Sequence, residues 1–127
     1  MIEALFQNDN YLATKKLLDA TALRHEALAS NIANVERPGY KRIDLAPTFE
    51  QELRSELRSG NTNRLASLQP SIQLDSTAVA SRADGNNVQL ASELLSMASN
   101  SANFDVLTQF ASGSLKQLRT AITGRSA

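Results

Sequence analysis

The last third of the chain carries its clearest hydrophobic pattern. Apolar positions recur at alternating spacings of four and three residues from about 88 to 123, and only Ser101 and Thr108 interrupt them. A helix of this length extends roughly 50 Å at 1.5 Å per residue, which is longer than a small domain is wide. The pattern therefore predicts a long coiled-coil helix. The predicted seam consists of Leu90, Leu94, Met97, Phe104, Ala111, Leu115, Leu118 and Ile122.

A second apolar line follows the back of the same predicted helix. Leu95, Val106 and Phe110 fall well away from the seam, so one partner helix cannot cover both lines. An uncovered stripe of this kind predicts contacts with other subunits. The alternative is that the short helix or the loop in the middle of the chain folds over it.

An N-terminal helix is expected from about 10 to 35, because this interval contains no Gly or Pro and is rich in Ala, Leu, Lys and Glu. Its apolar residues lie on two nearly opposite faces, whereas a surface helix of a monomeric protein usually has one apolar stripe. The pattern therefore predicts partners on two sides. We expect one of them to be the seam of the C-terminal helix, so that the two terminal helices form a coiled-coil hairpin.

The chain is expected to turn sharply at 36–47. Pro38 suits the second position of a type II turn, and Gly39 supplies the positive φ that the third position needs. A second, short helix is expected at about 48–59, ending at Gly60. Its apolar row is short and its other face carries alternating charges, which indicates a solvated surface.

The segment from about 60 to 87 is expected to be a long polar loop, since Ser, Asn, Thr and Gln dominate its composition. Residues 71–74 alternate like a short strand, but no convincing sheet partner is evident elsewhere in the sequence. The fold class expected for 1–127 is therefore a single all-α unit. It would combine the long helical hairpin with a short middle helix and this loop.

Charge and composition argue against several classes of function. Thirteen basic residues balance thirteen acidic ones in the 127-residue chain, so no net field favours nucleic acid. The sequence has no cysteine, and His25 is its only histidine. Neither a thiolate site nor a zinc site of the usual composition is expected. The glycines are too isolated for a phosphate-binding loop, and no nucleophile lies in a catalytic motif. We expect no enzyme activity, no cofactor, no metal and no small-molecule substrate.

A membrane-spanning helix and a cleavable signal peptide are also expected to be absent. The longest apolar runs are a few residues, whereas a helix needs roughly 20 to span a bilayer. An acidic residue, Glu3, stands where a secretory signal would carry basic residues. A cleavable signal peptide is therefore not expected.

Two stretches of the chain resemble flagellar basal-body rod proteins. In that family the N-terminal helix ends in an Asn-hydrophobic-Ala-Asn step and a Pro-Gly-Tyr turn follows. The corresponding residues are Asn31, Ile32, Ala33, Asn34, Pro38, Gly39 and Tyr40. The segments 84–90 and 118–122 look like the other end of the same family, and the short chain is most similar to members that form the proximal rod.

The resemblance implies a structural subunit of the bacterial flagellar basal body, needed for motility. Its terminal helices would pair as a coiled coil lining a tube that grows by helical assembly. The implied partners are other copies of the chain, other rod subunits, the membrane-ring base of the motor and the type III export apparatus. The implied location is the rod on the periplasmic side of the inner membrane. Two alternatives remain open: another short rod subunit, or a soluble coiled-coil export chaperone or adaptor.

Overall fold

The computed structural model describes residues 9–79 and 82–124, which form a mostly helical, elongated molecule. The first eight residues, which include the position that argues against a signal peptide, lie outside the described residues. None of the described helices has a stretch apolar and long enough to cross a membrane. The described elements, in chain order, are α2 (Asp9–Ala33), β1 (Ile43–Leu45), α3 (Thr48–Ser59), α4 (Thr62–Ser67), β2 (Ile72–Leu74) and α5 (Leu90–Thr123).

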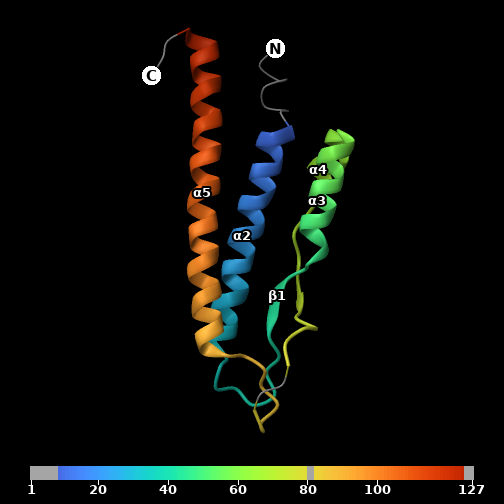
Figure 1. Ribbon diagram of the computed structural model, residues 1–127, viewed down its shortest axis with the longest axis vertical. Coiled ribbons are helices and arrows are strands. Elements are labelled where there is room, and N and C mark those ends of the chain that lie inside the picture. The colour runs from blue at the N-terminus through green and yellow to red at the C-terminus, as the bar shows by residue number, and fades with distance from the viewer. Residues whose placement is uncertain (1–8, 80–81, 125–127) are drawn as a thin grey trace.

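The two long helices, α2 and α5, lie side by side and antiparallel (Figure 1). The turn after α2 and the segment leading into α5 meet at one end of the molecule, and α5 continues past the level at which α2 begins. On its other side α2 contacts β1, α3 and α4. The two apolar faces expected of the N-terminal helix thus each find a partner within the same chain.

The expected all-α fold is wrong in one respect, because β1 and β2 form a small antiparallel sheet. Ile43 pairs with Leu74, and Leu45 pairs with Ile72. Two further backbone bonds extend the ribbon, from Ala46 N to Ser71 O at 2.8 Å and from Asp75 N to Arg42 O at 2.9 Å. β1 alternates apolar and polar residues over only three positions, which is too short a run to predict a strand. Its extended conformation is held by contacts from distant parts of the chain.

The expected polar loop also contains a helix. The side chain of Asn61 accepts a hydrogen bond from Arg64 N at 3.1 Å and caps α4 at its N-terminus. Leu65 projects from this short helix and is fully buried. The loop is therefore interrupted by a one-and-a-half-turn helix that contributes to the core.

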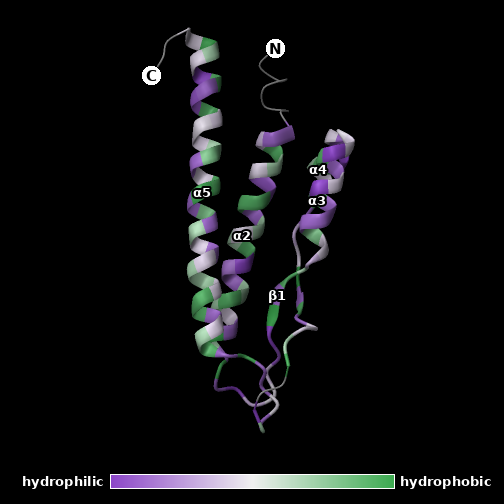
Figure 2. Ribbon diagram, viewed as in Figure 1, coloured by the Kyte–Doolittle hydropathy of each residue, from purple (hydrophilic) through white to green (hydrophobic). Residues whose placement is uncertain are grey.

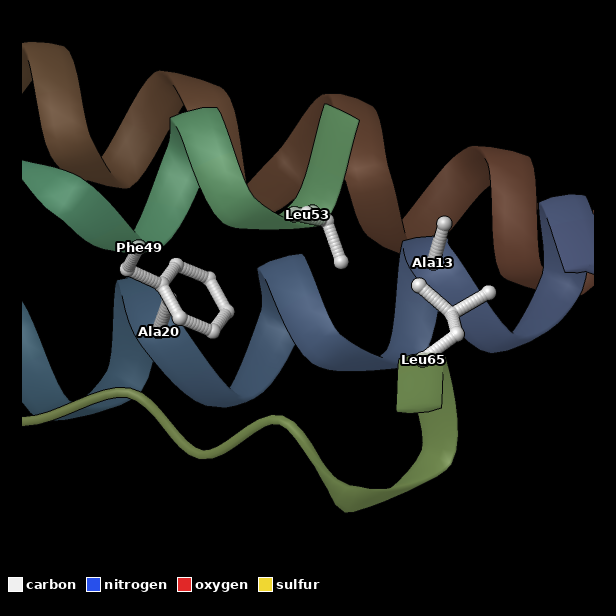
Figure 3. Packing of buried hydrophobic residues seen from close by; sticks show 5 residues of the cluster. All are labelled: Ala13, Ala20, Phe49, Leu53 and Leu65. Atoms are coloured by element: carbon white, nitrogen blue, oxygen red, sulfur yellow. The ribbon is translucent and has the colours of Figure 1, made fainter. Parts of the chain in front are cut away.

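The core lies between α2, α3 and α4 and is small. Its buried residues are Ala13, Ala20, Phe49, Leu53 and Leu65. Figure 3 shows the Phe49 ring against Ala20 of α2 and Leu65 beside Ala13. The small alanine side chains let α3 and α4 approach α2 closely, so two short elements can cover one side of a long helix.

The contact between α2 and α5 does not follow the whole predicted seam. Five of its residues keep between 42% and 55% of their surface exposed in the single chain. Met97, Ala111 and Leu118 are half-buried, although they lie on the same seven-residue line of the helix as the exposed Leu90 and Phe104. The exposed seam residues are Leu90, Leu94, Phe104, Leu115 and Ile122.

The displacement of the seam has a polar cause. Glu93 and Asn100 are the two buried residues of α5, and they lie seven residues apart on the line facing α2. The Asn100 side chain donates to Thr21 O of α2 at 2.8 Å. A pattern of hydrophobic residues cannot identify polar contact positions. The predicted seam therefore lies partly to one side of the line along which α5 contacts α2.

Replacing Leu65 by Ala tests the contribution of α4 to the core. Leu65 is fully buried, and such a truncation costs about 2–5 kcal/mol of unfolding free energy. Leu74→Ala is the matched control, because Leu74 is 64% exposed and should lose less than about 1 kcal/mol. Urea unfolding followed by circular dichroism measures both. Equal losses in the two variants would contradict the packing of α4 against α2.

Candidate functional site

The turn after α2 has the geometry that its sequence predicts. Gly39 has a φ of +74°, and Tyr40 N donates to Arg37 O at 3.3 Å, closing the turn around Pro38 and Gly39. The expectation of a positive φ at Gly39 is confirmed. Gly39 N also donates to Asp84 O at 2.9 Å. The turn is therefore attached to the segment that leads into α5.

Asn31, the first asparagine of the motif, is fully buried and serves as a strand partner for β1. Its Nδ2 donates to Ile43 O at 2.8 Å, and its Oδ1 accepts from Ile43 N at 3.0 Å. The same Oδ1 accepts from the Tyr40 hydroxyl at 3.2 Å, and Nδ2 also donates to Glu93 Oε2 at 3.1 Å. One amide thus joins α2, the turn, β1 and α5.

Asn86 supplies the end of α2 with a cap from a distant part of the chain. Its Nδ2 lies 3.0 Å from Asn34 O, 3.1 Å from Val35 O and 2.8 Å from Arg37 O. A helix end leaves such carbonyls without partners within the helix. Asn34, the second motif asparagine, has a local role instead and donates to Ser30 O at 2.8 Å.

The other motif residues differ in exposure. Ile32 and Tyr40 are half-buried, whereas Ala33 and Pro38 are exposed. The motif therefore combines two kinds of position. Some residues hold the turn from inside, and others present its outer surface to solvent.

Arg42 lies at the centre of an ion cluster, which we call the Arg42 cluster and which comprises Arg24, Arg42, Asp44, Asp75 and Glu93. Arg42 Nη1 lies 2.7 Å from Asp75 Oδ2, Nη2 lies 2.9 Å from Asp44 Oδ2, and Nε donates to Glu93 Oε1. Arg24 Nε donates to Asp44 Oδ1 at 2.8 Å. The guanidinium group therefore joins β1, the end of β2 and the first turn of α5.

The surroundings shift the pKa values within this cluster. Burial alone lowers the pKa of Arg42, but hydrogen bonds and charges from Glu93 and Asp44 outweigh it and raise the pKa above its ordinary value. Burial raises the pKa of Asp44, whereas hydrogen bonds from Arg24, the Leu45 amide and Arg42 bring it below its ordinary value. The Thr77 hydroxyl is the main group that lowers the pKa of Asp75. All three side chains are thus held in their charged forms.

The back of α5 is exposed in the single chain. Leu95 is 72% exposed, Phe110 68% and Val106 54%. Figure 2 shows hydrophobic positions recurring along α5 toward its C-terminal end. Within the described residues, α3 and the segment between α3 and α5 leave these three side chains largely exposed.

The sequence pattern missed the side chains that organise the site. The pair Lys41 and Arg42 reads as an isolated basic pair, and Glu93 as a surface acid of a long helix. A weak signal exists for Glu93, because it lies seven residues before Asn100 on one line of the helix. No signal in the sequence marks Arg42. Among the described residues no group of His, Cys, Asp or Glu could hold a metal ion.

Comparison with known proteins gives relatives that match nearly the whole chain, although no family model matches it. The flagellar basal body rod protein FlgB of Aquifex aeolicus (strain VF5) is 31% identical over 121 residues, covering 88% of this chain and 91% of the relative. The chain belongs to the FlgB family of flagellar basal body rod proteins.

Two further relatives carry the same description. FlgB of Borrelia hermsii is 27% identical over 125 residues, covering 84% of this chain and 90% of the relative. FlgB of Bacillus subtilis (strain 168) is 26% identical over 115 residues, covering 84% and 88%. The resemblance inferred from the motif is confirmed, and the chain is a structural protein of the flagellar basal-body rod.

Replacing Asn31 by Asp tests the strand-like role of its amide. The change keeps the shape, removes both donated hydrogen bonds and places a carboxylate beside buried Glu93. It should cost several kcal/mol of unfolding free energy, since a buried unpaired charge is that costly. Asn34→Asp is the control and should lose about 1 kcal/mol, because one half-buried bond is removed. Chemical denaturation measures the two. A larger loss for Asn34→Asp would refute the assignment.

The Arg42 cluster should make the protein sensitive to acid. Asp44 and Asp75 have lowered pKa values in the folded chain, so the unfolded chain binds protons more readily than the folded one. Their contribution to stability is present above the ordinary Asp pKa of about 3.9 and is lost as the pH falls through the folded values. Urea unfolding between pH 7 and pH 2 should show this loss. Asp44→Asn should be less stable at pH 7 and lose less on acidification; an unchanged acid slope would contradict the prediction.

Proposed function

We propose that the chain is a subunit of the proximal rod and that it assembles with other copies of itself and other rod subunits through the exposed face of α5. Leu95, Val106 and Phe110 carry this proposal, because they are exposed in the single chain and apolar. A long helix with such a face gains free energy when another subunit removes it from water.

The exposed half of the predicted seam supports the same proposal. Leu94, Leu115 and Ile122 do not need to contact α2 if they face neighbouring helices in an assembled tube. A coiled coil that lines the tube would then include helices from more than one subunit. Membership of the FlgB family supports this role over that of an export chaperone or adaptor, and FlgB relatives support it over another short rod subunit.

The wider setting belongs to the proposal too. The subunit would leave the cytoplasm through the flagellar export apparatus and would reach the periplasmic side of the inner membrane. There it would contact the membrane-ring base. No cofactor or small-molecule substrate has a part in this function, and no catalysis is proposed.

A double substitution, Val106→Ser with Phe110→Ser, tests the assembly face. Burial of each original side chain contributes roughly 1.5–3 kcal/mol, so their loss should abolish incorporation into rods. Export should persist, because both residues are exposed and the fold does not depend on them. The three measurements are motility, the amount of subunit that is secreted and the amount of subunit in isolated basal bodies.

The control is Glu52→Ser with Arg58→Ser, two exposed charged positions of α3. This variant should be exported and incorporated normally. Normal incorporation of the Val106 and Phe110 variant would refute the assembly face, whatever the control does.

A further inference from the structure

α5 carries very little charge on its long exposed surface. Between Glu93, which is buried, and Lys116 the only charged residue is Asp105. Helices that face water along most of their length usually carry charges on that face. The uncharged surface has two distinct parts, one in the first half of the helix and one in the second.

The first part is a ridge, which we define as Ala91, Leu95, Ala98 and Ala102. These residues follow one another at spacings of four, three and four, so they share one face of the helix. All four are exposed, and Leu95 projects from among three alanines with 72% of its surface in solvent. Small residues around one large one make a narrow ridge that a second surface can approach closely.

The second part is a groove of about 770 Å³ between α5, α2 and α3. All the residues around it are uncharged. Its lining includes the small residues Ala13, Gly113 and Ser114 and the larger apolar residues Leu57, Val106 and Phe110. A Cβ atom built at Gly113 meets nothing within 4 Å, so the space above this position is open.

We propose that the groove of one copy receives the ridge of a second copy. This inference rests on the proposed function and names the geometry of the same assembly face. Both surfaces are free of charge, so neither would leave an ion buried without a partner. The ridge covers about 16 Å of helix and the groove about the same length between Val106 and Gln117, at 1.5 Å per residue. The two surfaces are therefore both uncharged and of similar length.

In the proposed contact the two copies run parallel and are staggered, because ridge and groove lie at different heights on the same helix. Parallel copies would be offset by roughly 20 Å along α5, the rise over the 12 to 15 residues between ridge and groove. Each copy in such a contact keeps its own ridge or groove open for the next. A contact between two different surfaces that does not close on itself produces an open-ended assembly.

The absence of cysteine from the sequence permits a direct test by cross-linking. Leu95→Cys places a thiol on the ridge, and Gly113→Cys places one in the groove without a clash. The double variant replaces the native subunit in cells, and isolated basal bodies are treated with a short bis-maleimide and separated on a denaturing gel. A ladder of dimers, trimers and larger products is expected.

The matched control is Ser101→Cys with Gly113→Cys. Ser101 is exposed but lines a separate groove beside His25 and Glu26. This pair should give at least ten-fold less cross-linked product. When the single variants Leu95→Cys and Gly113→Cys are produced together in the same cells, each copy carries one thiol. The cross-linked product should therefore be a dimer only.

Three results would overturn the inference. A double-variant product that stops at the dimer indicates an antiparallel closed pair, cross-linking of Leu95→Cys to itself indicates ridge against ridge, and incorporation without cross-linking indicates no such contact. A native subunit missing from basal bodies would instead refute the proposed function.

A second measurement covers the case in which the cysteine variants are not incorporated. Leu95→Glu and Gln109→Lys should each reduce incorporation strongly, because each puts a lone charge into the contact. The two changes together place opposite charges face to face in every copy and should restore at least part of the lost incorporation. A combined variant no better than its parents would overturn the inference.

Discussion

The structure depends on keeping one partly buried guanidinium group neutralised. Arg42 follows the turn after α2, and its side chain is enclosed by carboxylates from β1, the end of β2 and α5. A buried charge without partners costs several kcal/mol, so the carboxylates around Arg42 together stabilise the closed fold. The position of the ribbon and the start of the long helix are thus fixed together by one side chain.

Polar groups also decide how the two long helices align. Asn31 reaches Glu93, and Asn100 reaches the backbone of Thr21, so the inner contact is specified by hydrogen bonds at two heights. Polar residues within a helical interface select one register at a cost in stability. The apolar side chains Leu95 and Phe110, which would stabilise a pair more strongly, face outward. Polar groups therefore align the two helices within the subunit, whereas exposed apolar side chains remain available for contacts between subunits.

The hydrophobic pattern sufficed to predict the long helices and the helix at Thr48–Ser59, and the Pro38 and Gly39 pair sufficed to predict the turn. Each of these depends on local sequence. The ribbon could not be predicted in this way, since the alternation in each strand covers only three residues. Contacts from Asn31 and Arg42 hold the strands in place. The contact line of α5 was misplaced for a related reason, because Glu93 and Asn100 pack at positions where a pattern analysis expects apolar residues.

The cap that Asn86 provides for α2 bears on how the chain folds. The amide and the carbonyls that it binds are separated by 49 to 52 residues, and Arg42 bonds across 51 residues to Glu93. Such contacts close long loops. The chain loses conformational entropy when a loop closes, and this cost arises before the bonds form. Neither the end of α2 nor the start of α5 can complete its structure from local sequence alone. We therefore expect the end of the first helix, the ribbon and the start of the last helix to fold in a single cooperative step that waits for the whole chain.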